Sequence, residues 1–257
     1  MVRGLYTAYT GMSNEQKRLD IIANNLANAA TVGYKEDSVT NQSFDNVLTY
    51  KIKDSSEASL AKPIGRMSLG VKLGEVYTNY KQGSLRQSDG KYHLALEGKG
   101  FFTLSVQDGN GNESIKYTRN GAFTITKDGQ LVDENGNAVL GESGEIIIPI
   151  ESREVTIDKS GNIYADNMLI NKLSIVDFED YNYLKKSQYT MYEAVDGAEE
   201  IESNASVHQG FTEQSNVNSV SEMVQMITVT RAYEANQKII QSIDKTLELA
   251  ANSVGKV

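Results

Sequence analysis

The 257-residue sequence contains no cysteine, no tryptophan and only two prolines. Without cysteine the chain has no disulfides, no thiolate zinc sites and no cysteine nucleophile. It also lacks the roughly 20 consecutive apolar residues of a membrane-spanning helix, and no apolar signal core follows its N-terminus, so we expect neither membrane insertion nor a cleaved signal peptide. A net charge of −9 at pH 7 disfavours nucleic-acid binding, which concentrates positive charge.

Residues for catalysis or metal binding are sparse. The two histidines, His93 and His208, stand in no metal-ligand or triad spacing. A calcium-like run begins at Asp133, but it lacks the glycine and glutamate that such a loop needs at its sixth and twelfth positions, so we interpret it as a turn. We therefore expect no enzyme activity, no cofactor and no metal. A secreted carbohydrate-binding or hydrolytic β domain stays open as the alternative, because carboxylates brought together by folding are not visible in one sequence.

An apolar seam runs along the first 30 residues. Four of its members recur every seven residues, which predicts a helix with one narrow apolar stripe. We expect the helix to end near residue 30, before a glycine suited to a left-handed cap. The seam residues are Leu5, Met12, Leu19, Ile22 and Leu26.

A stricter seam marks the C-terminal segment. Ser219 and Glu222 are spaced as a capping box, so we expect a helix to begin near residue 219. Steps of three and four residues then alternate, which is coiled-coil spacing. The seam residues are Met226, Val229, Tyr233, Asn236, Ile240, Ile243 and Leu247.

Neither seam is stable uncovered, since burial stabilises each large apolar side chain by roughly 1.5 to 3 kcal/mol. The two ends pack on one another or on the middle of the same chain, or they also pack on other copies of the protein; the spacing leaves these alternatives open. Amides at such positions fix the register between helices. The candidate register residues are Asn24, Asn25, Asn28 and Asn236.

The middle of the chain shows a period of two between frequent glycine, aspartate and asparagine turns, which predicts antiparallel strands. Residues 127–131 and 159–163 indicate two similar hairpins. The expected fold is α+β: paired, coiled-coil-like N- and C-terminal helices with an inserted antiparallel β-rich domain. We expect an inner helical domain at 1–35 and 216–257, an extended connector at 36–70 and an outer β-rich domain at 71–215.

Several motifs resemble those of the bacterial flagellar rod and hook proteins. They are ANNLAN at 23–28 followed by TVGYK at 31–35, LALEGKGFF at 94–102, YTRNGAF at 117–123, QGFTEQSNVN at 209–218 and MITVTRAYEAN at 226–236. The resemblance covers both ends and much of the middle.

This resemblance implies a structural, axial subunit of the flagellar basal body, most similar to distal rod proteins, with proximal rod or hook proteins as the alternative. It implies a helical homo-polymer that transmits torque from motor to hook. The implied partners are copies of the chain itself, other rod and hook proteins, and bushing rings around the rod. The implied location is the basal body in the cell envelope, reached by type III export without a cleavable signal. The seam and amide residues above would form the assembly interface.

Overall fold

The computed structural model describes residues 2–50, 63–107, 111, 113–152, 154–188 and 190–254. Its internal contacts divide the chain into two compact units. Unit 1 comprises Met1–Leu26, Asp37–Thr78 and Asn218–Val257, and unit 2 comprises Ala27–Glu36 and Asn79–Val217. Each unit is therefore assembled from segments that are distant in sequence.

Unit 1 combines the two long helices with two antiparallel strand pairs. Strand β1 pairs with β4 and β2 with β3, and the β1–β4 ladder slips by one residue between Val39 and Asn41. Within the described residues the elements are α1 (Val2–Ala27), β1 (Asp37–Ser43), β2 (Val47–Tyr50), β3 (Pro63–Met67), β4 (Val71–Thr78) and α2 (Ser219–Val254). The range expected as a connector, 36–70, thus contributes strands to the unit that holds the helices.

Helix α1 ends at Ala27, three residues before the predicted end. The cause is a turn in which the backbone N–H and the hydroxyl of Thr31 donate to the backbone and side-chain oxygens of Asn28. Gly33 adopts a left-handed φ of 69°, but it lies beyond this turn and does not cap the helix.

Helix α2 begins at Ser219 as predicted, but its cap is the preceding residue. The Oδ1 atom of Asn218 accepts hydrogen bonds from the backbone N–H groups of Val220 and Ser221. Asparagine is among the best N-cap residues because its side chain satisfies N–H groups that have no partner within the helix. The predicted capping box is therefore wrong, and Glu222 is left available for another role.

The regular elements of unit 2 within the described residues are short strands and one 3₁₀ turn. Its largest described sheet has the order β17-β18-β8-β7-β11-β10-β9, with β12, β16 and β19 attached, and β13–β15, β20–β6 and β21–β5 form smaller sheets. Within the described residues these strands pair antiparallel. The bounds are β5 (Leu85–Gln87), β6 (Leu94–Glu97), β7 (Phe101–Gln107), β8 (Glu113–Thr118), β9 (Thr124–Ile125), β10 (Leu131–Val132), β11 (Ala138–Gly141), β12 (Gly144–Glu145), β13 (Val155–Ile157), β14 (Asn162–Ala165), β15 (Met168–Lys172), β16 (Ile175–Phe178), a 3₁₀ turn η1 (Tyr181–Tyr183), β17 (Leu184–Lys186), β18 (Met191–Ala194), β19 (Glu200–Glu202), β20 (Ser206–Gln209) and β21 (Phe211–Glu213).

The two similar hairpins are confirmed. In the first, the N–H of Thr126 donates to the carbonyl of Gln130 across a turn that contains Gly129 at φ 83°. In the second, the N–H of Asp158 donates to the carbonyl of Asn162 across a turn with Gly161 at φ 82°. Such turns need a positive φ, which glycine adopts without strain.

Two apolar clusters stabilise unit 2. The larger one packs apolar side chains, including two phenylalanines, from β6, β7, β10, β11, β13, β14, β18, β20 and neighbouring loops. The smaller one is aromatic and contains Phe101, Tyr117, Phe178, Leu184 and Tyr192. The predicted α+β arrangement is confirmed as an N-terminal helix, a strand-rich middle and a C-terminal helix. Neither helix in the described ranges is long and apolar enough to cross a membrane.

Candidate assembly surface

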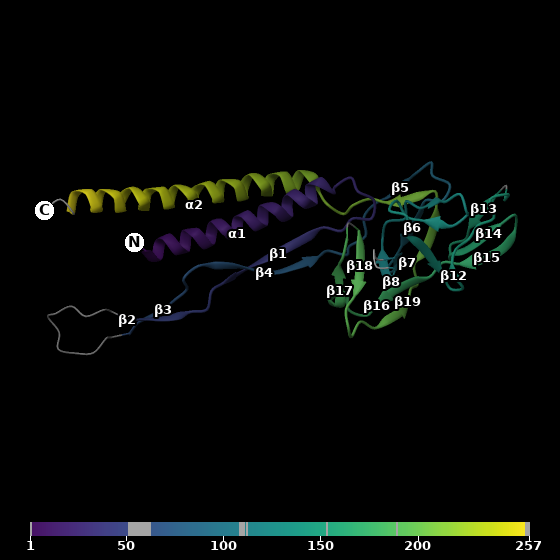
Figure 1. The fold of residues 1–257 in the computed structure, drawn as a ribbon, viewed down its shortest axis with the longest axis horizontal. Helices are drawn as coiled ribbons and strands as arrows, with labels where there is room; N and C mark the ends of the chain where they lie inside the picture. Colours follow the sequence, from purple (N-terminus) through teal and green to yellow (C-terminus); the bar gives the residue numbers. More distant parts are fainter. Residues whose placement is uncertain are drawn as a thin grey trace. The chain divides into compact units, whose positions relative to one another are not determined.

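The two helices of unit 1 run antiparallel and side by side (Figure 1). Gly4 faces the Cδ1 atom of Ile243, Gly11 faces the side chain of Asn236, and Asn25 bonds to Glu222. These three pairs share one register, in which each step of seven residues along α1 is matched by seven residues back along α2. Seven residues make about two helical turns, so all three pairs lie along one line of contact.

Glycine at position 11 gives the helices room to approach. A Cβ atom on Gly11 would lie 3.0 Å from Nδ2 of Asn236, which is closer than side chains normally pack. Glycine within a helix costs up to about 1 kcal/mol relative to alanine, so its presence here reflects a need for space.

Asn25 joins three segments of unit 1. Its Nδ2 atom donates to Oε2 of Glu222 on α2 at 3.2 Å and to the carbonyl of Asp37 on β1 at 2.8 Å. Its Oδ1 atom accepts from the N–H of Asp37 at 3.0 Å. Asn25 and Glu222 are only 2% and 3% exposed, so this polar contact is made inside the unit. A buried amide with defined partners favours one register over its neighbours.

The structure places the predicted seam residues at three levels of burial. Ile22, Asn25 and Val229 are buried, whereas Asn24 and Leu247 are exposed. The others are half-buried: Leu5, Met12, Leu19, Leu26, Asn28, Met226, Tyr233, Asn236, Ile240 and Ile243. Of the four candidate register amides, Asn25 and Asn236 meet the opposite helix, whereas Asn28 bonds to Thr31 in the turn after α1.

A second stripe on α2 is apolar and exposed. Val220, Met223, Val224 and Ile227 expose 45–66% of their surface. At 100° per residue these positions lie on the side of α2 opposite the line that contacts α1. A helix with apolar side chains on two opposite faces has more apolar surface than one neighbouring helix covers.

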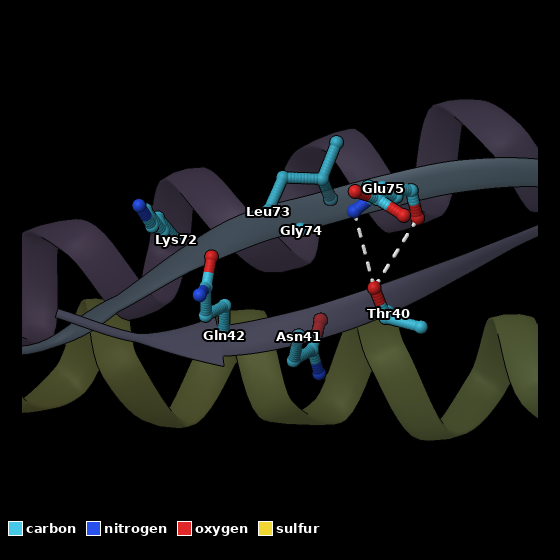
Figure 2. A pocket seen from close by; sticks show the side chains of 7 residues that line it. All are labelled: Thr40, Asn41, Gln42, Lys72, Leu73, Gly74 and Glu75. Atoms are coloured by element: carbon cyan, nitrogen blue, oxygen red, sulfur yellow. Dashed lines mark hydrogen bonds between the residues drawn. The ribbon is translucent and has the colours of Figure 1, made fainter.

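The slip in the β1–β4 ladder opens a shallow hollow of about 440 Å³ (Figure 2). Its lining is mostly polar, and Glu75 is its one carboxylate. The hydroxyl of Thr40 donates to the carbonyl of Glu75 and accepts from its N–H, which ties the two strands across the slip. This hollow offers neither the aromatic platform nor the paired carboxylates that the carbohydrate alternative requires.

Unit 2 contains a buried ionic cluster of Lys35, Arg119 and Glu213. The Nζ atom of Lys35 lies 2.5 Å from Oε1 of Glu213, and Nη1 of Arg119 lies 3.3 Å from Oε2. All three side chains are at most 5% exposed. Burial lowers the pKa of Lys35, and Glu213 opposes that shift by favouring the charged amine. Two cations around one carboxylate make Glu213 the residue on which the cluster depends.

The polar residues considered for chemistry have structural partners. Nδ1 of His93 lies 2.7 Å from the Ser88 hydroxyl, and Nε2 of His208 lies 2.7 Å from Glu97. The carboxylate of Asp133 accepts four hydrogen bonds from the turn that follows it. Among the described residues, no three His, Asp or Glu side chains are grouped to hold a metal ion.

Sequence reasoning missed Gly4, Gly11, Glu222 and the ionic cluster. The two glycines had a visible signal, since they are seven residues apart and each precedes a seam residue. The spacing of Glu222 from Ser219 indicates a local cap, and nothing local to Lys35, Arg119 or Glu213 indicates that they meet.

Models of flagellar families match three parts of the chain. "Flagella basal body rod protein" matches residues 5–35, "Flagellar hook protein FlgE/F/G D1 domain" matches 95–165, and "Flagellar basal body rod FlgEFG protein C-terminal" matches 208–253. The N- and C-terminal matches contain all the predicted seam residues.

Full-length relatives agree with these matches. The chain is 30% identical to flagellar basal-body rod protein FlgG of Buchnera aphidicola subsp. Acyrthosiphon pisum, over 96% of this chain and 98% of the relative. It is 30% identical to flagellar hook-basal body complex protein FlhO of Bacillus subtilis over the whole of both chains. It is 32% identical to flagellar basal-body rod protein FlgF of Caulobacter vibrioides, over 97% and 96%. The chain therefore belongs to the flagellar basal-body rod protein family and is a structural component of the flagellar basal body.

Proposed function

We propose that this protein polymerises with copies of itself into a helical tube that carries torque along the rod, at the distal position. The family membership supports a rod subunit, and the relatives include both FlgG and FlgF proteins. The distal position rests on the sequence motifs, whose resemblance to distal rod proteins is the strongest. The same proposal includes contacts with rod, hook and ring proteins and export without a cleaved signal. It also includes coiled-coil packing along the full length of α1 and α2.

The observation that carries the proposal is the exposed stripe of Val220, Met223, Val224 and Ile227 on the far side of α2. Unit 1 covers one face of α2 with α1, so the second face is available to another subunit. In the proposed arrangement, a different patch of the next subunit covers the stripe. Contacts between different patches are head-to-tail, and head-to-tail contacts that do not close into a ring extend as a helix. Interlocked helices suit torque transmission because packed interiors deform little.

A charge in the stripe tests this proposal. We expect Val224→Asp to abolish incorporation into basal bodies and motility, since the new carboxylate would be buried without a partner. Ser242→Asp places the same charge on an exposed, polar position of α2 and is the matched control. Normal rods with Val224→Asp would contradict the assignment of the stripe.

Cryo-electron microscopy of purified basal bodies tests the larger arrangement. We expect density for residues 2–30 and 219–254 in the rod wall, with the stripe covered by a neighbouring copy. Density for this chain outside the rod would contradict the proposal.

A further inference from the structure

Three segments of unit 2 continue directly into unit 1 outside the helix α1. They are the connections after Glu36, before Asn79 and after Val217. Asn216 lies on the last of these segments, next to the end of unit 2. The residues considered below all belong to unit 2.

The side chain of Asn216 holds the other two segments. Its Oδ1 atom accepts from the N–H of Glu36 at 2.8 Å. Its Nδ2 atom donates to the carbonyls of Asn79 at 2.7 Å and Lys81 at 3.1 Å. The N–H of Asn79 also donates to the carbonyl of Glu36 at 2.8 Å. One amide, with one acceptor and two donors in use, therefore links all three segments.

The ionic cluster of Lys35, Arg119 and Glu213 also links the same three segments. Glu213, on the same segment as Asn216, accepts from Nζ of Lys35 and from the N–H of Gly83. Nζ of Lys35 also donates to the carbonyl of Lys81 at 2.8 Å. The Lys81 carbonyl thus accepts one hydrogen bond from Lys35 and one from Asn216.

A local role for Asn216 does not explain these contacts. Asparagine in loops usually bonds to backbone groups two or three residues away. The partners of Asn216 are instead 135 to 180 residues away in sequence. The Asn216 amide therefore holds distant segments together and does not shape a single turn.

We propose that Asn216 is a positioning residue that cross-links the three segments, so that a force on one of them is shared by all three. The inference rests on the proposed function, because a subunit that carries torque must pass the force through the chain segments that join its parts. Glu213 and Lys35 form the second, charged layer of the same cross-link.

Hydrogen exchange of the full-length purified chain tests the contacts. Asn216→Ala removes all three bonds. We expect exchange at the N–H of Glu36, which loses its acceptor, to rise roughly tenfold, the effect of losing about one hydrogen bond of protection. We also expect exchange in residues 34–35 and 79–83 to rise, because the segments are no longer held through the Asn79 and Lys81 carbonyls. Asn216→Asp keeps the acceptor and loses both donors. It should therefore raise exchange in residues 79–83 while Glu36 stays protected.

Asn171→Ala is the matched control for general loss of stability. Asn171 is a more buried amide of unit 2, and its Oδ1 accepts from the N–H groups of Ser143 and Lys172. We expect it to leave exchange at residues 34–36 and 79–83 unchanged. Equal effects of Asn216→Ala and Asn171→Ala on those segments would overturn the proposal.

Motility under load tests the mechanical role. In cells that carry each variant in place of the normal gene, we expect Asn216→Ala to reduce swimming speed several-fold more in viscous medium than in dilute medium, whereas Asn171→Ala affects both equally. The same ratio of viscous to dilute swimming speed for both variants would overturn the cross-link. The control is deletion of the gene, which we expect to abolish swimming. Swimming without the gene would instead overturn the proposed function.

Discussion

Two isoleucines on the helices of unit 1 allow the covered and the exposed faces to be compared by the same substitution. Ile22 on α1 is 5% exposed, and Ile227 on α2 is 55% exposed. Changing either to alanine removes the same three carbon atoms. The difference between the variants therefore reports the surroundings of each side chain and not its chemistry.

The expected magnitudes follow from burial. Three carbons at about 0.8 kcal/mol each amount to about 2.4 kcal/mol for Ile22, and the cavity left behind raises the loss to about 3 kcal/mol. Ile227 is already more than half in contact with water, and alanine has the higher helix propensity. We therefore expect Ile227→Ala to lower the free energy of unfolding of the free chain by less than about 1 kcal/mol.

Urea unfolding followed by helical circular dichroism measures these losses in the free chain, and electron microscopy of basal bodies measures incorporation. We expect Ile22→Ala to destabilise the free chain, and Ile227→Ala to leave it nearly unchanged while reducing incorporation. Similar unfolding free energies for the two variants would refute the packing of α1 within unit 1. Normal incorporation of Ile227→Ala would refute the assembly role of the exposed stripe.

Two further predictions concern unit 2. Glu213→Gln leaves Lys35 and Arg119 buried without their carboxylate and should lower the free energy of unfolding in urea by about 3 to 5 kcal/mol. Glu142→Gln breaks the exposed ion pair with Lys172 and should cost far less, because water screens exposed charges. Equal losses for the two variants would contradict the dependence of the cluster on Glu213. Burial and the hydrogen bond to Glu200 raise the pKa of Tyr117 above its ordinary value of 10.0. Above pH 10 the folded state therefore keeps a proton that the unfolded state releases. The free energy of unfolding should fall as pH rises above 10, by up to about 1.4 kcal/mol per pH unit. Tyr117→Phe should show a shallower decline than the unaltered chain between pH 10 and 11, and parallel curves would disprove this coupling.

The sequence predicted the elements that depend on local periodicity. The seam from Met226 to Ile243 predicted helix α2, and the glycine turns predicted the antiparallel hairpins, because side-chain spacing and positive φ are local properties. The end of α1 was misplaced by three residues because a side-chain turn at Asn28 competes with the helix.

The contacts between distant segments were not predictable from the sequence. Glu222 has the spacing of a capping box, yet it bonds to Asn25 across unit 1. Lys35, Arg119 and Glu213 look like ordinary surface charges, and only the folded chain brings them together. Which copies cover the exposed stripe is a property of the assembly and stays a prediction.

The contact between Asn25 and Glu222 spans 197 residues of sequence. Closing so long a loop is slow and entropically costly, and the strand-rich middle can form while the last residues are still being synthesised. Unit 1 is completed only when α2 arrives. A chain that stops before α2 therefore lacks half of the helix pair and the partner of Asn25, and under the proposed function we expect it not to join the rod.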